Sequence, residues 1–172
     1  MQGVKRGCVR LLPHDISWKT EYSETAALLT RLWGDNVLNI AHVGSTAIGS
    51  IAAKPILDVA VKVRDITKMD IAILQEHGYE YRGPQQGSDT YHLFVLRDEN
   101  DYSLQHIHVY DQRDQQFEQL KSFVSYLNNH PDKAKEYNEL KTALAAKYPA
   151  DRPSYTRGKA EFILDIYRQM NK

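Results

Sequence analysis

The chain has 172 residues, of which 42 % are hydrophobic and 26 % are charged, and its formal net charge is zero. This composition is typical of a soluble protein with a core of ordinary size. Because proteins that coat nucleic acid carry a basic excess, we expect no nucleic-acid partner. Cys8 is the only cysteine, so no disulfide can form within the chain, and a reducing, cytoplasmic location is favoured.

From the hydrophobic pattern of the sequence we expect neither a membrane-spanning segment nor a leader segment. Residues 1–10 contain basic side chains with no apolar run behind them, unlike a secretory signal. The longest apolar stretch is interrupted by Lys54 and Asp58, so we expect no membrane partner. Glycine and proline are spread evenly and no repeat is visible, which predicts one domain over residues 1–172.

The first third of the chain is predicted to alternate between helix and strand. Apolar residues at spacings of three or four, from Trp18 to Trp33, indicate a helix. Asp15 or Ser17 can cap its start, and Gly34 ends it. The next elements are a strand, a short helical segment and a strand rich in β-branched residues, at residues 39–43, 48–53 and 56–63.

The middle of the chain is predicted to form one helix and three strands, and the last third is helical. Asp65 can cap a helix whose apolar face runs from Ile66 to Leu74, and Gly78 closes it. The three strands are expected at residues 79–82, 91–97 and 104–110. Three helices separated by prolines have apolar stripes within residues 117–127, 137–148 and 162–170. This order predicts an α/β (α+β) fold, with a mixed β-sheet flanked by helices and a helical C-terminal third.

A glycine-serine turn is the strongest candidate site, within His42-Val43-Gly44-Ser45-Thr46 and upstream of Asp58. Glycine lets backbone N–H groups approach a ligand closely, and such groups with hydroxyls hold phosphate oxygens. We therefore predict phosphate binding by Gly44, Ser45 and Thr46, with Lys54 as the nearest cation. The alternative is an ordinary capped turn, and the Gly-Lys-Ser/Thr triplet of a Walker A loop is absent.

Two histidines form the second candidate site. His106 and His108 are two apart on a predicted strand, so they point to one face. With Asp58 they would make a two-histidine, one-carboxylate set that suits a divalent ion such as Fe, Mn or Zn. The alternative is that the two histidines lie on a solvated face while their neighbours Ile107 and Val109 face the core.

The remaining polar residues give weaker signals. His42 and His92 fit structural, hydrogen-bonded histidines, and the tyrosines fall on helix stripes that core packing explains. Ser45 lacks the Gly-x-Ser-x-Gly elbow, which argues against a Ser-His-Asp hydrolase. Four basic residues are candidates for a rim around an anion, although for any single one a solvated surface position is the more common outcome. They are Lys54, Lys141, Arg157 and Lys159.

The chain resembles the GrpB-like family, which is placed in the nucleotidyltransferase superfamily with polymerase-β-like enzymes. The resemblance rests on four kinds of segment between about Pro13 and Ile166. They are His42-Val43-Gly44-Ser45-Thr46 with Ala53-Lys54-Pro55-Ile56-Leu57-Asp58, Pro13 with Trp18, Gln105-His106-Ile107-His108-Val109, and Tyr137-Asn138-Glu139-Leu140-Lys141 with Tyr155 and Lys159.

The resemblance implies a nucleotidyltransferase fold and a phosphate-binding turn at Gly44-Ser45. Enzymes of the superfamily follow this turn with an acid-x-acid pair and a third acid, which hold two metal ions. Here Asp58 matches the first acid, which the resemblance implies to be the catalytic residue. Ala60 stands at the position of the second acid, and the strand that would supply the third acid carries His106 and His108. Two functions remain open. One is a metal-dependent transferase acting on a nucleotide or phosphate-bearing ligand, and the other is a non-catalytic binding or regulatory module.

Overall fold

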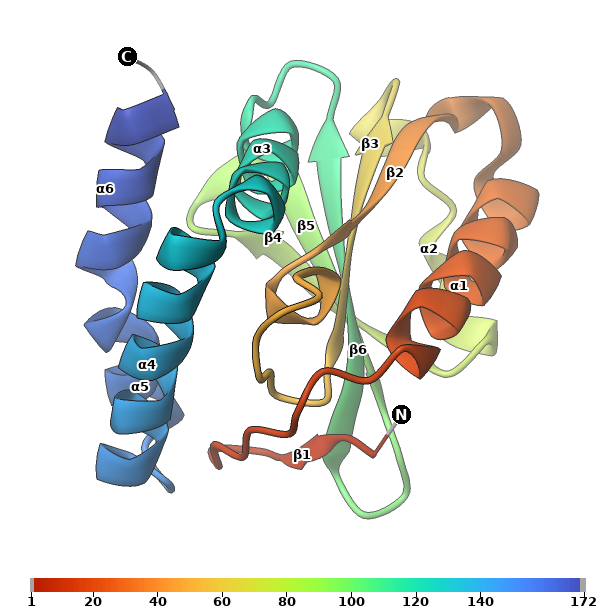
Figure 1. Ribbon diagram of the computed structural model, residues 1–172. Coiled ribbons are helices and arrows are strands. Elements are labelled where there is room, and N and C mark those ends of the chain that lie inside the picture. The colour runs from red at the N-terminus through yellow and green to blue at the C-terminus, as the bar shows by residue number, and fades with distance from the viewer. Residues whose placement is uncertain (1, 171–172) are drawn as a thin grey trace.

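A six-stranded mixed β-sheet forms the centre of the computed structural model, which describes residues 2–170 (Figure 1). The strands are β1 (Val4–Lys5), β2 (Val37–Val43), β3 (Leu57–Val63), β4 (Tyr79–Gln85), β5 (Ser88–Arg97) and β6 (Tyr102–Asp111). Their order is β2-β3-β6-β5-β4, and β1 pairs with β6. Only β3 and β6 run parallel, and the other pairs are antiparallel. The predicted mixed sheet is confirmed, whereas β1 is too short to show a hydrophobic period.

Helices cover both faces of the sheet. They are α1 (Ser17–Trp33), α2 (Ile71–Glu76), α3 (Gln116–Asn129), α4 (Pro131–Lys147), α5 (Arg152–Gly158) and α6 (Ala160–Met170). Figure 1 shows α1 and α2 on one side of the sheet and α3 to α6 on the other. Leu29 and Trp33 of α1 belong to the core on the first side, and Phe117 of α3 packs on the second. The predicted helical C-terminal third is confirmed.

Alternation along β3 and β6 decides which side chains face each layer. Val59 of β3 and Ile107 of β6 are fully buried in the core beneath α1. Ala60 lies in the opposite cluster, with Phe117 of α3. Since residues two apart in a strand share a face, the polar residues Asp58 and His106 turn toward the C-terminal helices.

The prediction of one continuous helix after Asp65 is wrong. A 3-10 turn, η3 (Ile66–Lys68), comes first, and the Asp65 side chain accepts a hydrogen bond from Thr67 N. Met69 then returns to extended backbone, and Asp70 caps α2 by accepting from Ile73 N. The second capping aspartate restarts the helix, because its carboxylate satisfies an N–H group that a continuous helix would bond internally.

The helical segment predicted at residues 48–53 is also wrong. Only a 3-10 turn forms before it, η2 (Ser45–Ala47), and residues 48–53 run as an irregular loop. Helix side chains satisfy its backbone: Asn128 Oδ1 accepts from Gly49 N at 3.1 Å, and Asn138 Oδ1 accepts from Ala52 N at 2.8 Å. Lys141 Nζ donates to the carbonyl of Ala52. These tertiary partners replace the hydrogen bonds that a local helix would supply.

The end of the chain contains one more helix than the three predicted. Pro153, taken as a separator, is the second residue of α5, where its missing N–H costs nothing. Asp151 caps this short helix by accepting a hydrogen bond from Ser154 N at 3.1 Å. A proline that starts a helix and one that ends a helix look alike in sequence, which explains why α5 was not predicted.

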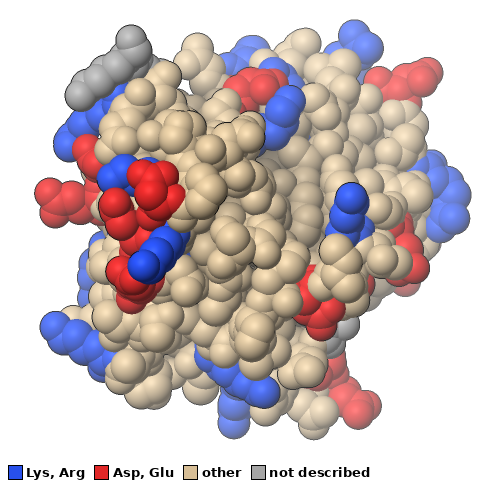
Figure 2. Space-filling view, in the orientation of Figure 1, with Lys and Arg blue, Asp and Glu red and all other residues tan. Residues whose placement is uncertain are grey.

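The surface carries charges of both signs. Figure 2 shows Lys and Arg intermixed with Asp and Glu on one face, and much of that face carries no charge. Among residues 2–170, no helix combines the length and apolar character needed to cross a membrane.

Candidate functional site

The glycine turn lies directly beside Asp58 because of the strand register. Val43, the last residue of β2, pairs with Asp58 near the start of β3, so Gly44 follows next to the carboxylate. Gly44 has φ +70° and ψ −173°, a conformation that is essentially restricted to glycine. A Cβ atom placed at Gly44 would lie 2.7 Å from Asp58 Oδ2. The glycine therefore allows both the turn and the close approach of the carboxylate.

Gly44→Ala should reduce the free energy of unfolding by about 1–3 kcal/mol, because both the backbone conformation and the contact with Asp58 are lost. Urea unfolding measures this change. Gly87→Ala is the control, because Gly87 has the same φ of +70° but open space around it. Equal losses in the two variants would show that the contact between Gly44 and Asp58 has no effect of its own.

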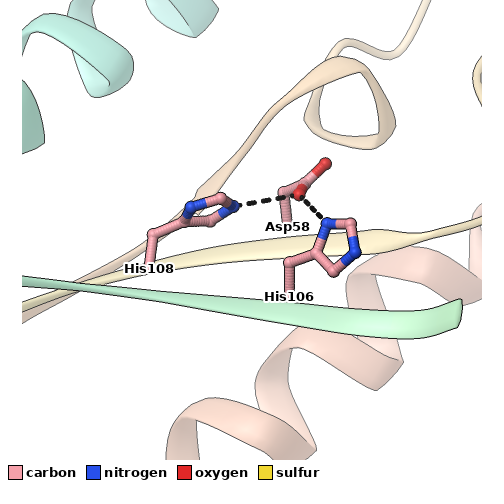
Figure 3. A group of neighbouring side chains, drawn as sticks. All are labelled: Asp58, His106 and His108. Carbon is pink, nitrogen blue, oxygen red and sulfur yellow. Dashed lines mark hydrogen bonds and ion pairs between the residues drawn. The ribbon is translucent and has the colours of Figure 1, made fainter. Parts of the chain in front are cut away.

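Asp58, His106 and His108 form one cluster (Figure 3). The parallel register places Asp58 opposite His106 on neighbouring strands. His106 Nδ1 and His108 Nε2 each lie 3.1 Å from the same atom, Asp58 Oδ1. The side chains are 29 %, 16 % and 19 % exposed, respectively, so the cluster is open to small ligands. The prediction that the two histidine positions share a face with Asp58 is confirmed.

The two histidines hold Asp58 in its charged form. Burial alone would raise the pKa of Asp58, but the hydrogen bonds from His106 and His108 outweigh it and keep that pKa well below its usual range. Burial lowers the pKa of His106, and the nearby carboxylate opposes this only in part. The cluster therefore contains a carboxylate and a neutral imidazole at neutral pH, which are the protonation states that a metal ion requires.

Tyr91 of β5 fixes the orientation of His108. Its hydroxyl lies 2.8 Å from His108 Nδ1, on the side of the ring away from Asp58. Burial raises the pKa of Tyr91 to about 12, so the phenol stays protonated. A partner on the second ring nitrogen is what orients the histidine ligands of metal sites.

The cluster fits one transition-metal ion better than a pair of magnesium ions. One ligand atom from each of Asp58, His106 and His108 lies within 4.8 Å of the others. Such a set with two nitrogens and one oxygen suits Fe, Mn or Zn. Magnesium prefers oxygen ligands, and the position that would supply a second carboxylate is Ala60, which is fully buried under α3.

A cavity of about 220 Å³ opens between this cluster and the C-terminal helices. Gly44, Ser45, Thr46, Lys54 and Asp58 all line it, as does His106. The side chains added by the helices are Leu120, Phe123, Tyr137, Arg152, Tyr155, Lys159, Ile163 and Tyr167. The structure thus brings the predicted turn, the predicted lysine and the predicted carboxylate into one cavity.

Three cations in the cavity lack a carboxylate partner. Within residues 2–170, Lys54, Arg152 and Lys159 form no ion pair at salt-bridge distance. Lys54 Nζ lies 5.6 Å and Lys159 Nζ lies 4.8 Å from the centre of the Tyr155 ring. Burial, followed by the charges of Arg152 and Lys159, lowers the pKa of Lys54 to about 7. Burial also lowers the pKa of Lys159, which the charge of Asp58 opposes in part and the charge of Arg152 reinforces.

Thr46 and His92, two other residues considered in the sequence, each have a side-chain partner within the protein. Thr46 is buried, and its Oγ1 lies 2.9 Å from His42 Nε2, so its hydroxyl already has a partner. His92 Nδ1 is 2.8 Å from the Tyr81 hydroxyl, as a structural histidine would be.

Two residues of the predicted basic rim do not lie on it. Lys141 is fully buried next to Tyr137, where it bonds the carbonyl of Ala52. Arg157 is exposed, and its Nη2 donates to Ser154 Oγ outside the cavity. Lys54 and Lys159 line the cavity, as the predicted rim requires, and Lys141 and Arg157 do not; binding of an anion by the two lining lysines stays a prediction.

Arg152 and the aromatic wall were not predicted. Arg152 begins α5, a helix that was not recognised, and no motif marks it as a ligand residue. Tyr137 was assigned to core packing and Tyr155 was noted only in the family resemblance, although both line the cavity. The signal that could have found Arg152 is its place just after the capping Asp151, in the turn that precedes Tyr155 and Lys159.

A family model and individual related sequences both match this chain over most of its length. The family model described as GrpB protein matches residues 8–169. The glutamate-rich protein GrpB of Alkalihalophilus pseudofirmus is 37 % identical over 99 % of this chain and 100 % of its own length. A UPF0157 protein of Pseudomonas aeruginosa is 32 % identical over 92 % of this chain, which spans 66 % of that relative.

Solved structures extend the comparison to the fold. The crystal structure of the conserved protein GrpB from Enterococcus faecalis has a TM-score of 0.85 and 29 % identity, and the match covers 93 % of this chain and 96 % of that one. The Cid1 poly(U) polymerase has a TM-score of 0.50 and 15 % identity, with 86 % of this chain and 49 % of that one covered. That likeness shows a nucleotidyltransferase-like fold. By sequence and structure, this chain belongs to the GrpB family.

Proposed function

We propose that the protein binds a small phosphate-bearing molecule in the cavity between Gly44-Ser45 and the C-terminal helices. The observation that carries this proposal is the group of three half-buried cations, Lys54, Arg152 and Lys159, which form no ion pair at salt-bridge distance within residues 2–170. Unpaired charges are costly away from water, and an anion in the cavity would offset that cost. Lysine and arginine are the side chains that recognise phosphate.

A nucleotide is the form of ligand that the rest of the cavity supports. Phe123, Tyr137 and Tyr155 line the cavity, together with aliphatic side chains. A largely apolar wall with a few convergent charged groups is typical of sites for small organic ligands. The apolar part of such a ligand would contact these apolar lining residues while its phosphate meets the cations.

A metal-dependent transferase is the second candidate, because Asp58, His106 and His108 can hold one divalent ion next to the same cavity. A bound ion would act as a Lewis acid toward a phosphate oxygen. Asp58 would hold the ion, the histidines would be co-ligands, and Lys54 would neutralise charge on the phosphate. One carboxylate cannot build a pair of magnesium sites, so we expect little or no Mg²⁺-dependent nucleotidyl transfer from ordinary triphosphates.

Two assays test these functions. In a thermal-shift screen of phosphate, pyrophosphate and nucleotides, the ligand class should raise Tm, since binding at 100 times Kd stabilises a protein by about 2.7 kcal/mol. The binding proposal fails if no phosphate compound shifts Tm or binds in calorimetry. A labelled-triphosphate assay with Mg²⁺, Mn²⁺ and Zn²⁺ tests transfer, and robust Mg²⁺-dependent turnover would contradict the argument from Ala60.

A further inference from the structure

The charges around the cavity do not balance. Lys54, Arg152 and Lys159 line it, and Asp58 is the only carboxylate among its lining residues. Lys141, buried beside Tyr137, is a fourth basic group, and burial, followed by the charges of Lys159 and Lys54, lowers its pKa to about 7. The lining alone therefore carries three positive groups against one negative group.

Asp58 is also poorly placed to neutralise these cations. Its Oδ1 is shared by His106 and His108, which both bond it at 3.1 Å. Its Oδ2 packs against Gly44, where even a methyl group would lie only 2.7 Å away. The charge of Asp58 raises the pKa of Lys54, Arg152 and Lys159 and so favours their charged forms. One carboxylate, held by its own strand and turn neighbours, still cannot balance three basic groups.

The cations are positioned as a group around one ring. Lys54 and Lys159 come from segments that are distant in the sequence, yet both lie within 6 Å of the centre of Tyr155. Attraction to the ring face holds ammonium groups in place. Arg152 starts the same short helix that contains Tyr155, and its guanidinium can bond two oxygens of a phosphate at once.

Magnesium, which serves phosphate binding in the transferases of this fold, does not fit this arrangement. A magnesium ion needs several oxygen ligands, and Asp58 is the only carboxylate that the cavity offers. Lys54, Arg152 and Lys159 occupy the role that metal ions have when they neutralise phosphate oxygens.

We propose that Lys54, Arg152 and Lys159 bind an oxyanion group with at least two negative charges, such as a diphosphate, directly and without Mg²⁺. This inference rests on the proposed binding function and specifies its ligand class. An anion beside Lys54, whose pKa is lowered to about 7 by burial and neighbouring cations, would favour its protonated form. Three lining cations less one carboxylate then leave a net charge of two to be neutralised. A singly charged ligand would leave the cavity unbalanced.

Calorimetric titration with pyrophosphate tests the inference, once in EDTA and once with excess Mg²⁺, with sulfate as a dianion comparison. We expect pyrophosphate to bind in EDTA, to bind more tightly than sulfate, and to gain nothing from Mg²⁺. Lys159→Met should weaken binding about 10-fold or more, since one charge-assisted contact is lost. Lys147→Met is the matched control, because Lys147 is exposed outside the cavity and its Nζ lies 5.2 Å from the Tyr148 ring centre.

Each other result has a definite meaning. Pyrophosphate binding that requires Mg²⁺ would overturn the inference and leave the phosphate-binding proposal standing. Equal affinity of Lys159→Met and the parent, with both proteins folded by circular dichroism, would also overturn it. Failure of every phosphate compound to bind in either condition would overturn the binding proposal itself.

Discussion

Replacement of His106 or His108 by alanine should lower the affinity of the protein for Zn²⁺ or Co²⁺ by more than 100-fold. Each substitution removes one of three ligands that lie within 4.8 Å of one another. Loss of an outer-shell partner alone costs about 10–100-fold, so the loss of a direct ligand should cost more. Competition with a chromogenic chelator gives the affinities, and Co²⁺ absorption reports the nitrogen ligands.

Tyr91→Phe should have the smaller effect of about 10–100-fold, because it removes only the hydroxyl that orients His108. His92→Ala is the matched control for the histidine variants. His92 also lies 2.8 Å from a tyrosine hydroxyl, that of Tyr81, but it is not in the Asp58 cluster. Unchanged metal affinity in both cluster variants would show that Asp58 and the histidines form a hydrogen-bonded group that binds no ion.

Acidification should destabilise the protein between about pH 6.5 and pH 4 through His42. Burial lowers the pKa of His42 from 6.5 to about 4, and the charge of Asp58 opposes this only partly. The unfolded chain therefore takes up the proton first, so stability is complete above pH 6.5 and falls as the pH decreases toward 4. The shift corresponds to about 2 kcal/mol after allowance for the partly exposed ring.

His42→Gln should remove this part of the pH dependence. Glutamine keeps a polar group near Thr46, which His42 contacts at 2.9 Å, but it does not titrate. The stacking of His42 on Tyr22, with ring centres 5.1 Å apart, is lost at all pH values and so does not affect the slope. Urea unfolding at pH 7.5 and pH 4.5 measures both proteins, and an equal loss of stability in the two would exclude His42 as the source.

The sequence by itself determined the parts of the structure that depend on neighbouring residues. Strand alternation sorted Ile107 and Val109 into the core and turned His106 and His108 to the other face. The glycine turn was predicted from Gly44-Ser45 following a strand, and the positive φ of Gly44 shows why glycine is needed there. Both signals depend on a few neighbouring residues, so the local sequence is enough to reveal them.

Tertiary structure alone decided how these parts meet. The parallel pairing of β3 with β6 brings Asp58 beside histidines about 50 positions away, and no local pattern specifies which strands pair. The loop at 48–53 forms no helix because Asn128, Asn138 and Lys141 satisfy its backbone from α3 and α4. Arg152 joins Lys54 in one cavity only because α5 packs against the rest of the fold. Hydrophobic periodicity shows which face of an element is buried but not which element covers it, and the unpaired charge of the cavity depends on that packing.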